Sequence, residues 1–213
     1  MKRVFILVIL AVGCLVSYGQ STHFENVFKA CCMARSSMEH YDASIGVLKE
    51  ATSLLTSSEW TPLILQDEDV SGEADISSHL VFSPAFLKKL QENQNVFKRA
   101  RKYAMEADAL QRGGSVMLCT KCIGPENAVT YSLRGCPGKM YVGAVAEVNG
   151  LINLYVKVKD SKGREKLYKV SSDEFKGANQ RRLGIDMPEG FSSVYITIEN
   201  KSPLAKSVAL IIE

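Results

Sequence analysis

The sequence has little net charge and few histidines, and each scarcity argues against a class of function. Its 213 residues carry a formal charge of +3 and three histidines. Without Lys2 and Arg3 the charge falls to about +1, so overall electrostatics favour neither a nucleic-acid nor an anionic membrane partner. His23, His40 and His79 share no metal-ligand spacing and lie in no recognisable catalytic constellation. No glycine-rich phosphate loop is present either.

Long apolar runs, repeats and low-complexity tracts are also missing after residue 19. No later run is long enough to form a transmembrane helix. The hydrophobic content of 46% is ordinary for a globular protein, and the remaining length suits one large domain or two small ones. We therefore expect a globular protein without a transmembrane segment, cofactor or metal, and without a nucleic-acid partner.

The start of the chain has the pattern of an export signal. Lys2 and Arg3 precede an apolar run, Val4–Val16, and the small residues Ser17 and Gly19 stand where a signal peptidase cuts. This pattern predicts that the protein is exported to the periplasm or the extracellular space. Its cysteines are then expected to meet an oxidising compartment.

A lipoprotein signal is the competing interpretation of the same segment. Ala11 to Cys14 approximates the small-residue box before a lipidated cysteine, which would anchor the protein through Cys14. That box usually begins with Leu rather than Ala11, and Leu15 and Val16 continue the apolar run where lipoproteins turn polar. Plain secretion is the favoured interpretation.

The pattern after the signal predicts two helices. Apolar and small residues from Phe24 to Leu55 recur in steps of three and four, and Thr22 with Glu25 forms a capping box at the start. A second helix is indicated from Ser83-Pro84 to Gly113-Gly114. Two helices of similar length predict an antiparallel hairpin.

The pattern changes to that of short strands after Gly114. The expected strands are Val129–Leu133, Met140–Val148, Leu151–Lys159, Lys166–Val170, Phe191–Glu199 and Ser207–Ile212, separated by turn signals such as Asn149-Gly150. They predict an antiparallel, jelly-roll-like β-sandwich in a protein of the α+β class. The expected division is a signal peptide (1–19), a helical hairpin or bundle (20–113), a cysteine-containing linker (114–127) and a sandwich (128–213).

Residues 139–213 carry motifs of one known family. Met140-Tyr141-Val142-Gly143 leads into Ile152 to Val156, and Pro188-Glu189-Gly190-Phe191 precedes Val194 to Asn200. The segment resembles the pre-peptidase C-terminal β-sandwich of secreted bacterial proteins, although the family's acidic pair before the central strand is replaced by Gly150 to Asn153. The resemblance implies an accessory domain without chemistry of its own.

Five cysteines follow the signal: Cys31, Cys32, Cys119, Cys122 and Cys136. The spacing of Cys119 and Cys122 matches a redox pair or half of a zinc site. No βαβ context accompanies it, and the other two zinc ligands would have to come from Cys136 and the helix, so structural disulfides are favoured. In an antiparallel hairpin, Cys31 or Cys32 would bridge to Cys119 or Cys122.

Two charged segments have weaker functional interpretations. Asp67, Asp69, Ser71 and Asp75 follow the first half of a calcium loop, but Ser78 replaces its bidentate glutamate. A solvated acidic loop is favoured. The cations of Lys98 to Lys102 are read as the solvent face of a helix rather than as a phosphate site.

These observations favour a secreted, non-catalytic binding protein of the bacterial cell envelope. The expected partner is a cell-envelope protein or glycan, contacted by loops such as Ser171–Arg182 and Lys201–Lys206. The alternative is a thiol-disulfide or zinc-dependent enzyme that uses Cys119 and Cys122.

Overall fold

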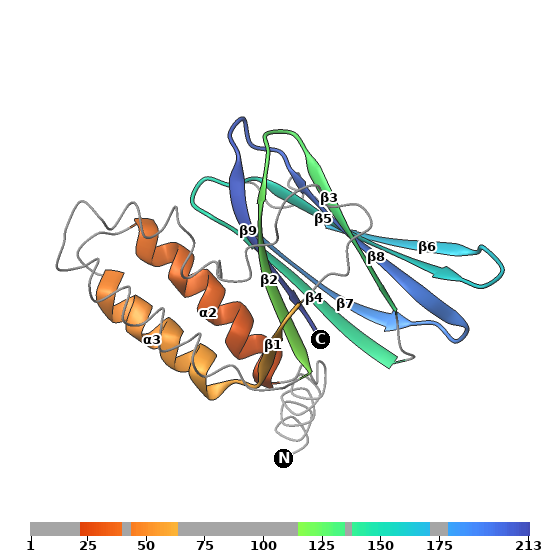
Figure 1. The fold of residues 1–213 in the computed structure, drawn as a ribbon, viewed down its shortest axis with the longest axis horizontal. Coiled ribbons are helices and arrows are strands. Elements are labelled where there is room, and N and C mark those ends of the chain that lie inside the picture. The colour runs from red at the N-terminus through yellow and green to blue at the C-terminus, as the bar shows by residue number, and fades with distance from the viewer. Residues whose placement is uncertain (1–21, 40–43, 64–114, 135–137, 171–178) are drawn as a thin grey trace, which may run out of the picture.

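The computed structural model describes residues 22–39, 44–63, 115–134, 138–170 and 179–213, which form two helices and two β-sheets (Figure 1). The helices are α2 (Thr22–Glu39) and α3 (Ser44–Ser57). The strands are β1 (Trp60–Pro62), β2 (Val116–Ile123), β3 (Ala128–Arg134), β4 (Gly138–Ala146), β5 (Ile152–Asp160), β6 (Glu165–Val170), β7 (Gln180–Met187), β8 (Phe191–Asn200) and β9 (Lys206–Ile212).

The strands form a five-stranded sheet in the order β1-β2-β9-β4-β7 and a four-stranded sheet in the order β3-β8-β5-β6. Every pairing is antiparallel except that of β1 with β2. Helices followed by two antiparallel sheets confirm the α+β class. The jelly-roll-like connectivity stays a prediction.

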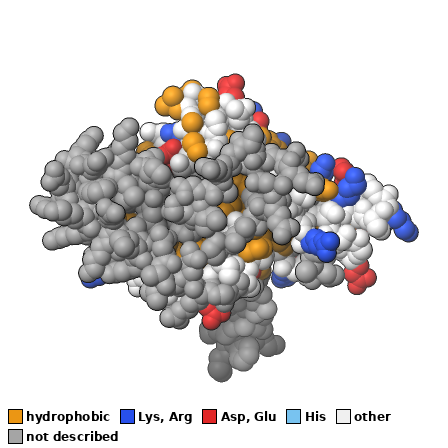
Figure 2. All heavy atoms as spheres, in the orientation of Figure 1, with side chains coloured by type: hydrophobic (Ala, Val, Ile, Leu, Met, Phe, Trp, Pro, Cys, Tyr) orange, Lys and Arg blue, Asp and Glu red, His pale blue; other side chains and the backbone are white. Residues whose placement is uncertain are grey.

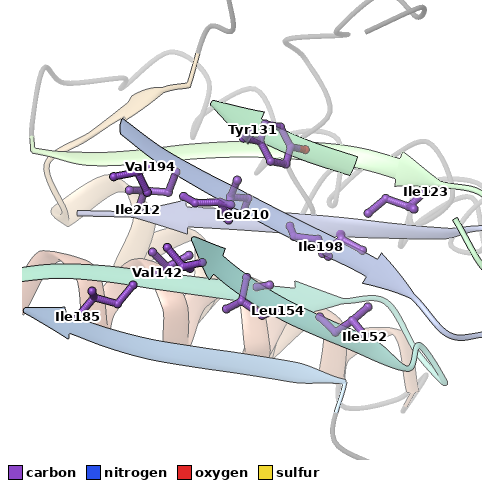
Figure 3. Packing of buried hydrophobic residues seen from close by; sticks show 14 of the residues in the cluster. Ile123, Tyr131, Val142, Ile152, Leu154, Ile185, Val194, Ile198, Leu210 and Ile212 are labelled. Atoms are coloured by element: carbon purple, nitrogen blue, oxygen red, sulfur yellow. The ribbon is translucent and has the colours of Figure 1, made fainter. Parts of the chain in front are cut away.

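One apolar core lies between the two sheets. Figure 3 shows its side chains, among them Val142 and Leu210 of the five-stranded sheet and Leu154 and Ile198 of the four-stranded sheet. Strand β8 alternates buried and partly exposed residues along most of its length, as expected when one face of a strand packs inward and the other meets solvent. The alternation that predicted these strands therefore reflects this core.

A second core joins the helices to the outer face of the five-stranded sheet. Phe24 and Phe28 of α2 lie over Gly143 of β4, and a Cβ atom on Gly143 would stand 2.6 Å from Cδ2 of Phe28. Tyr141 packs beside Phe24, with ring centroids 5.7 Å apart. Glycine at position 143 thus allows the helix to approach the strand closely.

The prediction of one continuous helix from Phe24 to Leu55 is wrong, because the segment forms α2 and α3, which pack against each other. A straight helix of that length would extend about 48 Å. The longest described strand has 10 residues and extends only about 33 Å, so a single helix would project beyond the sheet on which it packs. By folding back, α3 buries Leu48 and Leu55 against α2 rather than exposing them. The predicted helix after Ser83 lies outside the described residues.

The predicted linker 114–127 contains β2, which pairs with β9 inside the five-stranded sheet. Strands β1, β2 and β7 were not expected, whereas all six predicted strands are present within two residues. The sequences of the three unexpected strands, such as Cys-Thr-Lys-Cys in β2, lack the regular apolar alternation. Within the described part of the chain, neither helix is long and apolar enough to cross a membrane.

Candidate functional site

The structure places Cys119 and Cys122 on opposite faces of β2. Residues three apart on a strand point to opposite sides, and their Cα atoms lie about 10 Å apart, whereas a disulfide needs less than about 7 Å. Cys119 packs into the core between the sheets, and Cys122 shares the face of Leu118, which packs under the helices. Both thiolates of a zinc site would also have to lie about 2.3 Å from one ion. The pair therefore has the spacing but not the geometry of a redox or zinc motif.

The surroundings of Cys119 favour the protonated form of its thiol. Burial raises its pKa to about 12, although a hydrogen bond with the Tyr131 side chain acts in the opposite direction. Burial also raises the pKa of Tyr131, which is 3% exposed. A reactive cysteine needs a lowered pKa and access to solvent, whereas Cys119 has a raised pKa and is only partly exposed.

The cysteines of α2 are also protonated, packed side chains. Burial raises the pKa of the Cys31 thiol strongly and that of Cys32 to about 11. The Cys32 thiol donates to Oε1 of Gln180 on β7 at 2.9 Å. Cys31, Cys32, Cys119 and Cys122 are free thiols in this structure. The bridge between helix and sandwich stays a prediction, and Cys136 lies outside the described residues.

The remaining predicted site residues are outside the described part of the chain, with one exception. They are Asp67, Asp69, Ser71, Asp75, the segment from Lys98 to Lys102, His40 and His79. His23 is described, and its Nδ1 accepts a hydrogen bond from the Glu59 amide at 3.2 Å. Among the described residues, no group of three His, Cys, Asp or Glu side chains could hold a metal.

The feature best suited to binding is the outer surface of the four-stranded sheet, which we call the open face. It is formed by the outward side chains of β3, β8, β5 and β6: Ala128, Thr130, Ser132, Arg134, Ser193, Tyr195, Thr197, Glu199, Asn153, Tyr155, Lys157, Lys159, Glu165, Leu167 and Lys169. Only Asn153 among them is buried. The open face is thus accessible across all four strands.

The strand register arranges the open face in rows that run across the sheet. One row holds Thr130, Thr197, Tyr155 and Lys169, and the next holds Ser132, Tyr195, Lys157 and Leu167. The Thr130 and Thr197 hydroxyls lie 2.9 Å apart and are hydrogen bonded. The Nζ atom of Lys157 lies 5.8 Å from the Tyr195 ring centroid. Two tyrosines in adjacent rows are therefore surrounded by hydroxyls and lysines.

A hydrogen-bonded cluster around Glu199 fixes one end of the open face. Its Oε2 accepts from Nδ2 of Asn153 at 2.8 Å and from the Tyr155 hydroxyl at 3.0 Å. Its Oε1 lies 2.7 Å from Nζ of Lys201. The pKa of Glu199 is lowered, chiefly by the hydrogen bond from Lys201 and further by those from Asn153 and Tyr155, which together outweigh the opposing effect of burial. The carboxylate is thus ionised and holds Tyr155 in place.

The open face carries an excess of positive charge. Its carboxylates are already paired, because Glu199 contacts Lys201 and Glu165 lies 3.5 Å from Lys157 and 3.6 Å from Lys159. Arg134 and Lys169 are exposed and form no ion pair with another described residue. Figure 2 shows Lys and Arg side chains along the part of the molecule where β5 and β6 project.

The loops beside this cluster are held by the buried side chain of Asn200. Its Nδ2 lies within 3.0 Å of the carbonyl oxygens of Ile123, Gly124 and Leu204, and its Oδ1 accepts from the Ser202 amide at 2.9 Å. The predicted contact loop Lys201–Lys206, whose last residue begins β9, is therefore anchored to Asn200 at Ser202 and Leu204. In the other predicted loop, residues 171–178 are outside the described part, and Gln180 to Arg182 belong to β7.

Sequence reasoning did not identify the open face. The alternation in β5 and β8 predicted which residues point outward, so Tyr155 and Tyr195 were identifiable as outward residues. The sequence did not give the strand order or the register, which bring Thr130 of β3 beside Thr197 of β8. The signal for a site was the polar and aromatic composition of the outward positions.

No protein-family model and no curated protein matches the chain. Solved structures similar to it include the Yersinia pseudotuberculosis-derived mitogen, which is 15% identical over 46% of this chain and 84% of its own, with a TM-score of 0.35. The periplasmic g-type lysozyme inhibitor PliG of Aeromonas hydrophila is 11% identical over 46% of this chain and 86% of its own, with a TM-score of 0.31. A family 16 carbohydrate-binding module is 12% identical over 46% of this chain and 75% of its own, also with a TM-score of 0.31.

Proposed function

We propose that this protein is an exported, non-catalytic binding protein of the bacterial cell envelope, and that its open face binds an extended glycan. The observation that carries the proposal is the composition of that face. Tyr155 and Tyr195 lie in adjacent rows among the hydroxyls of Thr130, Thr197 and Ser132. A tyrosine offers an apolar ring face with a polar tip, which suits the apolar and hydroxyl-bearing surfaces of a sugar ring.

A glycan fits the open face better than a protein partner does. The central part of a protein interface is depleted in Lys, Glu and Ser and enriched in Tyr, Trp, Phe, Met and Arg. The open face is instead rich in Lys, Glu, Ser and Thr, and besides Tyr155, Tyr195 and Arg134 its one large apolar side chain is Leu167. Its polar side chains can instead bond the hydroxyls of a sugar chain.

The open face is also organised before any ligand binds. Its residues project from paired strands, and the Glu199 cluster fixes Tyr155. Fixing side chains in advance lowers the entropy cost of binding. The N-terminal pattern from Lys2 to Gly19 supports export to a compartment in which envelope glycans occur.

The test is affinity electrophoresis of the purified protein through gels that contain cell-envelope polysaccharides. We expect retardation by at least one polysaccharide, and we expect Tyr195→Ala to reduce it about tenfold or more, as for loss of a central aromatic contact. Thr130→Val keeps the shape and strand preference of the residue but removes a hydroxyl, and it should weaken binding less.

Val47→Ala is the control, because Val47 is a partly exposed apolar residue of α3, which packs with α2 on the outer face of the other sheet. Its binding should equal that of the wild type. Thermal unfolding of each variant shows whether it remains folded. Absence of retardation by every polysaccharide, with folded protein, would contradict the proposal.

A further inference from the structure

The structure assigns a charge to the ligand: we propose that the open face selects an acidic polysaccharide, one that carries carboxylates along its chain. This inference rests on the proposed function and specifies its ligand class. It starts from two cations of the open face that form no ion pair with another described residue, Arg134 on β3 and Lys169 on β6.

These two cations lie at opposite edges of the four-stranded sheet. Four neighbouring strands, each about 4.8 Å from the next, separate β3 from β6 by about 14 Å. The register also offsets Arg134 from Lys169 by two rows, and Tyr195 and Lys157 belong to the row between them. An extended chain that crosses the sheet diagonally would meet a cation at each edge and a tyrosine between them.

The carboxylates of the open face do not cancel this charge. Glu165 lies within reach of two lysines, Lys157 and Lys159, whose side chains remain 44% and 43% exposed. One carboxylate neutralises one lysine, so this group keeps a positive charge. Glu199 is occupied by Lys201 at 2.7 Å. A neutral glycan would leave these cations without partners, whereas an acidic one would complement them.

The local excess is compatible with the near-neutral overall charge. The formal charge of the whole chain is only +3, so a long-range attraction to every polyanion is not expected. Selectivity for an acidic glycan over other polyanions should come from the tyrosines and hydroxyls, which contact sugar rings. The spacing of the cations would then favour chains with repeated carboxylates.

The experiment compares polygalacturonate with its fully methyl-esterified form, because the two share one sugar backbone and differ in charge. We expect retardation of the protein by polygalacturonate, a strong decrease after esterification, and a decrease as salt rises, since salt screens exposed charges. Double-stranded DNA serves as a polyanion without the sugar polymer's ring surface. It should retard the protein less than polygalacturonate does.

The variant Arg134→Gln with Lys169→Gln removes both of these cations. Exposed ion pairs are individually weak, so we expect the affinity for polygalacturonate to fall about five- to tenfold. The matched control is Lys139→Gln with Lys162→Gln, which removes the same net charge at exposed positions of β4 and the β5–β6 turn. This control should bind like the wild type.

The outcomes separate the two proposals. If the esterified polymer or another neutral glycan binds as well as polygalacturonate, the charge inference is wrong and the proposed glycan binding stands. If DNA binds as strongly, or both double variants lose affinity equally, binding is unselective and the inference is overturned. If no glycan binds, the proposed function fails together with the inference.

Discussion

Cys119 and Cys122 point to opposite faces of one strand, although their spacing in the sequence is that of a redox pair. Cys119 packs with the core between the sheets, and Cys122 lies on the face that carries the helices. Two cysteines at this spacing can form a redox pair only where the backbone brings the two sulfurs toward each other, as at the start of a helix. An extended strand separates them.

Thiol labelling should therefore differ sharply along β2. At pH 8, a pKa of about 12 leaves about one Cys119 in ten thousand as thiolate, and its partial burial also hinders the reagent. We expect iodoacetamide to label the exposed Cys122 within minutes and Cys119 only after unfolding, as read by peptide mass spectrometry. Cys122→Ser is the control and should abolish the fast phase. A disulfide between Cys119 and Cys122 in a non-reducing digest would contradict this placement.

Gly143→Ala should destabilise the protein, because the new Cβ would lie 2.6 Å from the Phe28 ring. The ring or the whole of α2 would have to shift, and overpacking of this kind costs about 1–3 kcal/mol. Urea unfolding measures the loss. The matched control is Gly184→Ala on the neighbouring β7, where the nearest atom is Cε1 of Tyr141 at 3.4 Å, an ordinary contact. Equal stability of the two variants would argue against close packing of α2 on β4.

Asn200→Ala should lower stability by about 2 kcal/mol or more. The side chain is 0% exposed and bonds backbone groups of two loops, Gly124 between β2 and β3 and both Ser202 and Leu204 between β8 and β9. Buried groups that lose their partner each cost about 1–3 kcal/mol. Chemical denaturation would measure the change, with the exposed Asn127→Ala as a control expected within about 0.5 kcal/mol of the wild type. A loss no larger than that of the control would show that these loops are held by other contacts.

The stability that the turn between β5 and β6 gives to the fold should depend on pH through the carboxylate of Asp160. Its carboxylate accepts from the backbone amides of Lys162 at 3.0 Å and Arg164 at 2.7 Å, and from Nε of Arg164 at 2.6 Å. Burial alone would raise the pKa of Asp160, but these hydrogen bonds outweigh it and hold the pKa below its ordinary value of 3.8. A lowered pKa stabilises the fold above pH 3.8, and this stabilisation is lost as the pH falls through the folded-state value.

Asp160→Asn should therefore be less stable than the wild type at pH 7, and the difference should shrink as the pH falls below 3.8. Thermal unfolding between pH 2 and pH 7 tests this expectation. Asp186→Asn, at an exposed position of β7, is the isosteric control. A stability difference that stays constant across this range would show that the ionised carboxylate of Asp160 is not the stabilising group.

Sequence patterns predicted the strands that have regular alternation and missed those that lack it. Apolar and polar residues alternate in β5 and β8 because one face of each strand packs on the core, so the sequence itself shows their periodicity. β2 carries Thr120, Lys121 and Cys122 in place of regular alternation, and it becomes a strand through its pairing with β9. The separation of α2 from α3 was also missed, because the spacing of three and four residues runs on from one helix to the next.

The sequence by itself determined that helices precede the strands of the sandwich, and it determined the outward positions of the central strands, because these depend on local periodicity and turn residues. The export signal and the glycan ligand remain proposals. The tertiary structure alone decided which strands are neighbours, and with that the rows of the open face, the opposite placement of Cys119 and Cys122, and the approach of Phe28 to Gly143. The physical reason is that strand pairing and helix packing join residues far apart in the chain. Such partners are chosen by the burial of a shared core rather than by any local pattern.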